Sequence, residues 1–170
     1  MEQQAAQLQQ QKRASQYRYQ QDYLNHLREQ QTFLVGGHHP DYDRDPYFFT
    51  PPIYRYSRGG RYYEVNQYAA DLLRQAVNFG YQEGFRAGEA DRMDHWRSDY
   101  QASFAYQDAN YGYNGYYVER DDYNYYFREG FRRGYEDGYG NRYVYGRYEG
   151  GSHVMLELNL GQILGFVSIR

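Results

Sequence analysis

The sequence contains no cysteine among its 170 residues. This absence excludes disulfide bonds, thiolate metal sites and cysteine nucleophiles, and it is compatible with any cellular compartment. No apolar run reaches the roughly 18 residues expected of a membrane-spanning helix. Acidic residues outnumber basic ones, 22 to 19, and the formal net charge is -3. A polyanion such as DNA is therefore not expected as the main partner.

Much of the apolar surface that the chain can bury comes from tyrosine. There are 25 tyrosines against 9 phenylalanines and 1 tryptophan, and the mean hydropathy is -1.10. A buried tyrosine contributes the area of its ring but needs a hydrogen-bond partner or water for its hydroxyl. We therefore expect a thin core that is partly polar.

The most informative feature is a short repeat in which glycine recurs every fourth residue. Residues 80–91 and 126–137 align at a shift of 46 (130 minus 84) and share the pattern Glu-Gly-Phe-Arg-x-Gly-x-x-Asp. A four-residue step places these glycines along one side of a helix. The residues expected to pack the helices together are Gly80, Gly84, Gly88, Gly130, Gly134 and Gly138.

These glycines carry an energetic cost that has to be offset. Each helical glycine costs roughly 0.8 to 1 kcal/mol relative to alanine, so six forfeit about 5 kcal/mol. Close approach of two backbones is the contact that only glycine permits. We therefore predict a mainly α fold of antiparallel helices packed through Gly-xxx-Gly stripes, with a small β-hairpin and an N-terminal Gln-rich helix. The alternative is that the glycines break the helices into turns.

The chain divides into four segments by composition. Residues 1–35 form a Gln-rich helical arm, and residues 36–65 form a loop followed by a hairpin, with Gly59-Gly60 between two aromatic runs. Residues 66–145 form the Gly/Tyr-rich helical domain with the internal repeat, and residues 146–170 form an apolar C-terminal tail.

Three helices are expected in the Gly/Tyr-rich segment. Asn66 is a good N-cap for the first, which continues to about Arg92. A middle helix is expected from about residue 94 to residue 109, and Asp121 or Asp122 caps the last. Short connections between them predict antiparallel packing.

The tail concentrates aliphatic residues, and its spacing fits a strand and a helix equally well. It docks either on a groove of its own fold or on another subunit, because a freely exposed apolar patch promotes association. We hypothesise that it mediates self-association of a homo-oligomer. The residues assigned to this role are Leu156, Leu158, Leu160, Ile163, Leu164 and Val167.

The chemistry-bearing motifs are weak. The loop from His38 to Asp45 is the densest potential ligand cluster, but Pro52 stands where the bidentate glutamate of a calcium loop belongs. We interpret it as a polar surface loop and predict no metal, no cofactor and no catalytic residue. Glu83 and Glu129 have arginine neighbours on their helices and are expected at salt-bridged surface positions.

Arginine and tyrosine interleave through the chain, as in Tyr54-Arg55-Tyr56, and arginine outnumbers lysine eighteen to one. Such mixtures form cation–π and stacking contacts, either within the protein or with bases and sugars. RNA binding is therefore one alternative function, although it normally comes with an excess of basic residues.

Three runs carry a resemblance to other proteins: residues 62–88, residues 106–113 and residues 127–139. With them, roughly residues 15–145 resemble a group of uncharacterised Tyr/Gly-rich exported proteins of acidobacterial type. The group has no established activity and no catalytic residues, so the resemblance implies only export. The N-terminal residues lack the basic region and apolar stretch of a secretory signal. The expected location is thus periplasmic or extracellular after removal of a leader, with the cytoplasm as the alternative.

These observations favour a non-enzymatic structural or interaction protein of the bacterial envelope. It would present Tyr-rich surfaces to its own copies or to a glycan. Two alternatives belong to other classes: an Arg/Tyr-rich RNA-associated protein, and a small metal-dependent enzyme that uses the loop from His38 to Asp45.

Overall fold

The computed structural model describes residues 2–35, 49–115 and 117–169. The helices are α1 (Glu2–Gln10), α2 (Ala14–Val35), α3 (Gln67–Met93), α4 (Phe104–Asp108), α5 (Arg120–Gly140) and α6 (Glu157–Leu164), with a 3-10 turn at Tyr100–Ala102. The strands are β1 (Tyr54–Arg58), β2 (Arg61–Val65), β3 (Gly146–Glu149), β4 (Ser152–Met155) and β5 (Val167–Ser168). The predicted fold class, mainly α with a small β element, is confirmed.

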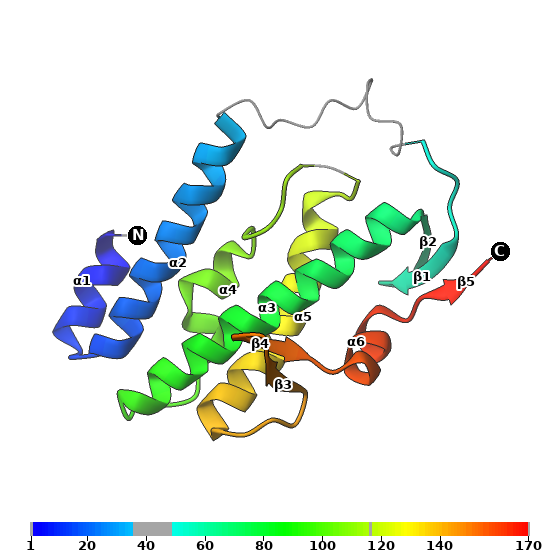
Figure 1. Cartoon of the computed structure of the whole chain (residues 1–170). Coiled ribbons are helices and arrows are strands. Elements are labelled where there is room, and N and C mark those ends of the chain that lie inside the picture. Colours follow the sequence, from blue (N-terminus) through cyan, green and yellow to red (C-terminus); the bar gives the residue numbers. More distant parts are fainter. Residues whose placement is uncertain (1, 36–48, 116, 170) are drawn as a thin grey trace.

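Helices α3 and α5 lie side by side at the centre of the molecule and run in the same direction (Figure 1). Going along both helices, Gly80 faces the main-chain carbonyl of Phe127, Gly84 that of Phe131, and Gly88 that of Tyr135. The prediction of antiparallel packing is therefore wrong for these two helices. The connection from residue 94 to residue 119 is long enough to return the chain to the starting end.

The contact between the two helices is reciprocal. On α5, Gly130 faces the carbonyl of Val77, Gly134 that of Tyr81, and Gly138 that of Phe85. Gly80 and Gly130 thus occupy equivalent positions in the helix contact, 50 residues apart (130 minus 80). The sequence repeat has a shift of 46 residues, so the two spacings differ by about one helical turn. A Cβ at any of the six glycines would overlap a carbonyl oxygen, so the backbones approach closely enough for Cα–H···O contacts.

The boundaries of the helices follow the sequence only in part. Asn66 caps α3 as predicted, since its side-chain oxygen accepts a hydrogen bond of 2.8 Å from the amide of Ala69. The middle helix, expected from about residue 94 to residue 109, is much shorter. After the end of α3 the chain makes a 3-10 turn at Tyr100–Ala102 and then forms α4. The N-cap of α5 is Glu119, and the predicted caps Asp121 and Asp122 lie in its first turn.

Tyrosines are among the largest fully buried side chains of the core, and several of their hydroxyls reach carboxylates. Tyr81 donates to Asp137 at 2.7 Å, with both side chains fully buried. Tyr19 donates to Glu83 at 3.1 Å. Glu83 is 1% exposed, so its predicted surface position is wrong, whereas Glu129 makes the expected ion pairs with arginines of its own helix.

Helices α1 and α2 form an arm that packs on the same side of the molecule as α4 (Figure 1). Polar contacts hold it there. Arg13 pairs with the buried carboxylate of Asp91 at 2.7 Å. The carboxylate of Asp94 accepts hydrogen bonds of 2.9 Å from the amides of Ser15 and Gln16. A carboxylate at this place satisfies unpaired amides of the first turn of α2 and interacts favourably with its dipole.

Two hairpins with glycine turns complete the fold. β1 and β2 are antiparallel with Arg58 opposite Arg61, and both turn residues, Gly59 and Gly60, have positive φ (59° and 79°). A two-residue turn of this kind matches the twist of the strands, and the predicted hairpin is confirmed. A second hairpin, β3–β4, was not predicted; it turns through Gly150-Gly151 with φ of 59° and 83°.

The tail is strand and helix in turn, and it docks on its own fold. β4 packs against α3, α6 packs against α3 and α5, and β5 pairs with β1. β5 extends the first hairpin to a three-stranded sheet in the order β2-β1-β5. Of the two docking sites that the sequence left open, a groove of its own fold or another subunit, the tail occupies the first.

Candidate functional site

The candidate site is a cleft between the first hairpin and the start of α5. Tyr56 of β1 and Tyr63 of β2 stand opposite each other in the hairpin. Their rings stack with centroids 5.2 Å apart at an interplanar angle of 18°. Side chains alternate between the two faces of a strand, so Tyr62, next in sequence, lies on the other face and is 77% exposed. The hairpin thus presents a fixed aromatic pair towards α5.

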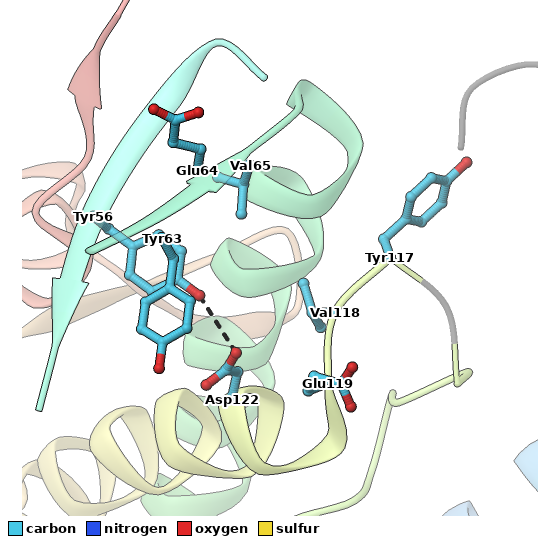
Figure 2. Close-up of a pocket in the computed structure, with 8 residues that line it drawn as sticks. All are labelled: Tyr56, Tyr63, Glu64, Val65, Tyr117, Val118, Glu119 and Asp122. Carbon is cyan, nitrogen blue, oxygen red and sulfur yellow. Dashed lines mark hydrogen bonds between the residues drawn. The ribbon is translucent and has the colours of Figure 1, made fainter. Parts of the chain in front are cut away.

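The opposite wall is the chain that leads into α5. Asp122, in the first turn, is buried. Its carboxylate forms a short ion pair with the Arg58 guanidinium and accepts a hydrogen bond of 3.5 Å from the Tyr56 hydroxyl. Figure 2 shows the Tyr56 and Asp122 side chains pointing toward each other across the cleft. These contacts fix the aromatic wall and the carboxylate relative to each other.

The cleft has a volume of about 380 Å³, within the range of small-molecule sites. In Figure 2, Tyr117 and Glu64 point outward at its rim. Tyr117 stacks on Tyr68 with centroids 5.7 Å apart and has a φ of 70°, which is uncommon for a bulky residue. The lining residues are Tyr56, Tyr63, Glu64, Val65, Tyr117, Val118, Glu119 and Asp122.

The cleft is acidic as well as aromatic. Glu119 and Asp122 contribute carboxylates, and the lining contains no lysine or arginine. Glu64 lies on the other face of β2 and pairs with Arg55 at 3.0 Å. Burial, reinforced by the Asp122 charge, raises the pKa of the Tyr56 hydroxyl well above its usual range. The hydroxyl is therefore protonated at neutral pH and remains a donor. Such a site offers acceptors and ring faces to a ligand that brings hydroxyls or positive charge, and it repels phosphates.

The glycines predicted to pack helices all lie at the α3–α5 contact described above. The residues predicted for self-association are divided. Leu160 and Leu164 are buried against the core of the same chain, at 5% and 3% exposed. Leu158 and Val167 are exposed at 74% and 62%. Leu156 is the N-cap of α6 and is half-buried, as is Ile163.

The loop from His38 to Asp45 lies outside the described residues. Within residues 2–35, 49–115 and 117–169, no group of three or more His, Asp or Glu side chains could hold a metal ion. Over the same ranges, no helix is both long and apolar enough to cross a bilayer.

Sequence reasoning missed the residues of the cleft. The hairpin itself was predicted, and its alternation places Tyr56 on one face, but nothing local indicates which helix that face meets. Asp122 was interpreted as a helix cap, whereas its side chain turns to Arg58. The pairing of an arginine in a hairpin with an aspartate 64 residues away has no short-range signal.

Comparison of the chain with protein-family models, with curated proteins and with solved structures finds no match.

Proposed function

We propose that the protein is a non-enzymatic binding protein whose acidic, Tyr-lined cleft contacts a neutral glycan. One observation carries the proposal: the stacked rings of Tyr56 and Tyr63 and the carboxylate of Asp122 are held in fixed positions relative to each other. Asp122 is bonded to both Arg58 and Tyr56. Sugar recognition needs ring faces for the apolar side of the pyranose and fixed acceptors for its hydroxyls. A site in which both are already positioned loses little entropy on binding.

The chemistry of the cleft favours a neutral glycan over RNA. A phosphate backbone needs cationic side chains along its path, and the cleft is lined by carboxylates instead. Arg58, the nearest guanidinium, is already paired with Asp122. The arginines that lie over aromatic rings do so within the protein, as Arg74 does over Tyr54 at 5.4 Å.

The same geometry favours binding over catalysis. A catalytic acid or base must be within hydrogen-bond reach of the proton that it transfers, whereas the Asp122 carboxylate already accepts from the Arg58 guanidinium and the Tyr56 hydroxyl. Its contacts suit a fixed acceptor. We therefore propose no catalytic role for it.

Export to the bacterial envelope is part of the proposal, and only the resemblance in sequence supports it. Self-association is a further part, and the exposed side chains of Leu158 and Val167 are the residues of the tail left to support it. The mass of the native assembly from the source organism tests both, since it reports processing and stoichiometry together.

Calorimetric titration with neutral cello-, chito- and malto-oligosaccharides tests the glycan proposal. Tyr63→Ala should weaken binding at least tenfold, and Glu119→Gln should weaken it several-fold without a stability cost, because Glu119 is exposed and makes no capping bond. Tyr62→Ala is the matched control, because Tyr62 is its neighbour on the other face, and should leave affinity within twofold. No binding to any of the three series, or equal losses for Tyr62→Ala and Tyr63→Ala, contradicts the proposal.

A further inference from the structure

An aromatic cluster lies on the surface beside the second hairpin. His153 of β4 stacks on Phe85 of α3 with ring centroids 3.7 Å apart, and Tyr148 of β3 meets the imidazole edge to face at 5.2 Å. Tyr143, in the chain between α5 and β3, stacks on Phe85 at 5.2 Å. Tyr143 and Tyr148 are 45% and 61% exposed. The cluster therefore packs one imidazole against a buried phenyl ring and two exposed phenols.

The Tyr143 hydroxyl and the Nδ1 of His153 lie 2.8 Å apart, within hydrogen-bond distance. In the tautomer that carries its proton on Nε2, the Nδ1 accepts from the hydroxyl. Burial, reinforced by the Arg86 charge, lowers the pKa of His153 against the opposing effect of Glu89, so the imidazole is neutral at neutral pH. A base at this distance can take the phenol proton while the ring loses an electron.

Tyr143 combines this base with access from solvent. Five other tyrosines donate to carboxylates, but they lie in the core and none is more than 6% exposed: Tyr19, Tyr23, Tyr56, Tyr81 and Tyr135. Tyr125 is 41% exposed, but the Arg58 guanidinium lies over its ring with its carbon 5.2 Å from the centroid. A cation at a ring face opposes the removal of an electron from that ring.

We propose that Tyr143 is a site of one-electron oxidation, at which a haem peroxidase with hydrogen peroxide joins two copies of the chain through a dityrosine bond. The oxidant removes one electron from the Tyr143 phenol, the hydroxyl proton passes to the Nδ1 of His153, and a neutral phenoxyl radical remains. Two such radicals form one carbon–carbon bond at ring positions next to the oxygens, and the hydrogen of each joined carbon moves to its oxygen as a proton. Overall, two phenols and one hydrogen peroxide give one dityrosine and two waters.

The site shares no residue with the lining of the cleft beside the first hairpin, so either proposal can fail without the other. The test treats the full-length protein with a haem peroxidase and limiting hydrogen peroxide, and maps the dityrosine peptides by mass spectrometry. Tyr143 should take part in cross-links at least threefold more often than Tyr62, although Tyr62 is 77% exposed, and more often than Tyr125. Cross-links that favour Tyr62 or Tyr125 overturn the proposal, because accessibility would then decide the site.

His153→Gln tests the role of the base, because the glutamine amide can accept a hydrogen bond but cannot take up the proton. Cross-linking at Tyr143 should fall at least fivefold, whereas cross-linking at Tyr62 should stay within twofold. His95→Asn, at an exposed position, is the control and should leave both yields within twofold. A Tyr143 yield that His153→Gln leaves unchanged overturns the proposal and makes His153 a packing residue.

If His153→Gln lowers the melting temperature, the wild-type protein provides the same test through pH. The share of cross-links that involve Tyr143 should fall between about pH 7.5 and pH 5, because protonation of His153 removes the acceptor. The other charged or titratable groups near the imidazole are Glu89, Arg86 and Tyr148, and the ordinary pKa values of these residue types lie outside this range. A share that does not change with pH overturns the proposal.

Discussion

The α-carbon of Gly84 faces the main-chain carbonyl oxygen of Phe131 with no space between them for a methyl group. Neither atom can move away easily, because both belong to helix backbones. The same relationship recurs on each side of the helix pair, so the distance between α3 and α5 is set by backbone contact rather than by side chains.

Gly84→Ala should therefore destabilise the protein by about 1 to 3 kcal/mol or more, because the overlap outweighs the gain of about 1 kcal/mol in helix propensity. Chemical denaturation measures the change. Gly161→Ala is the matched control, since Gly161 lies in α6 with no atom within 4 Å of an added Cβ. It should stabilise by up to about 1 kcal/mol. A Gly84→Ala protein as stable as the wild type would show that the helices do not meet at their glycines.

The buried ion pair between Arg13 and Asp91 predicts a large loss of stability when the Arg13 side chain alone is replaced. Arg13→Met should cost about 3 to 5 kcal/mol at neutral pH, because it leaves a carboxylate that is 1% exposed without its cation. Burial already raises the pKa of Asp91, so at mildly acidic pH the carboxylate can take up a proton and the loss should be smaller. Arg28→Met, at an exposed position of α2, should change stability by less than about 0.5 kcal/mol. Equal losses for the two variants would contradict the assignment.

The tail should behave as part of the core. Leu164→Ala should cost about 2 to 4 kcal/mol, because Leu164 is 3% exposed. Leu158→Ala should cost less than about 0.5 kcal/mol, because Leu158 is 74% exposed. Denaturation curves give both numbers. Removal of residues 153–170 should destabilise the protein further by taking away β5 from the sheet and α6 from the helices. A truncated protein with unchanged stability would mean that the tail docks elsewhere.

The interaction of His26 with Glu83 predicts how the stability of the protein changes with pH. Its Nδ1 lies 3.5 Å from the Glu83 carboxylate, at the limit of hydrogen bonding, and this interaction raises the pKa of the imidazole above 6.5 against the opposing effect of burial. A raised pKa in the folded state means that the stabilisation is fully present below about 6.5 and is lost as the pH rises through the folded value. His26→Gln should therefore lose a few tenths to about 1 kcal/mol near pH 5.5 and less near pH 8.

The control for this prediction is His95→Asn. His95 is exposed and has a φ of 54°, a conformation that asparagine tolerates. The substitution should change stability by less than about 0.5 kcal/mol. A His26→Gln loss that grows with pH would show that the imidazole is held neutral, as burial favours for His153, whose pKa is lowered.

Local sequence signals predicted the parts of this fold that depend on neighbours in the chain. Gly59-Gly60 indicated the hairpin, Asn66 the start of α3, and the glycine spacing the existence of a tight helix contact. The direction of α5 relative to α3 depends on the path of residues 94–119, which connect the two helices. The spacing of apolar residues there predicted a long helix, but the chain forms a 3-10 turn and a short helix.

The candidate site was harder to predict for the same reason. Tyr63 and Asp122 come together only because α5 runs parallel to α3 and so begins beside the hairpin that precedes α3. An antiparallel α5 would have placed its first turn at the opposite end. The buried position of Glu83 likewise depends on the arm, since Tyr19 and His26 of α2 cover it.

The most direct test of the binding cleft is a titration of the isotope-labelled protein with the tightest-binding neutral oligosaccharide, followed by amide chemical shifts. We expect the largest shifts on residues 56–65 and 117–122. A separate exposed aromatic group, Tyr143 and Tyr148 beside His153, should remain unchanged. Shifts that centre on Tyr143 and Tyr148, or no shifts at saturating oligosaccharide, would contradict the assignment of the cleft as the glycan site.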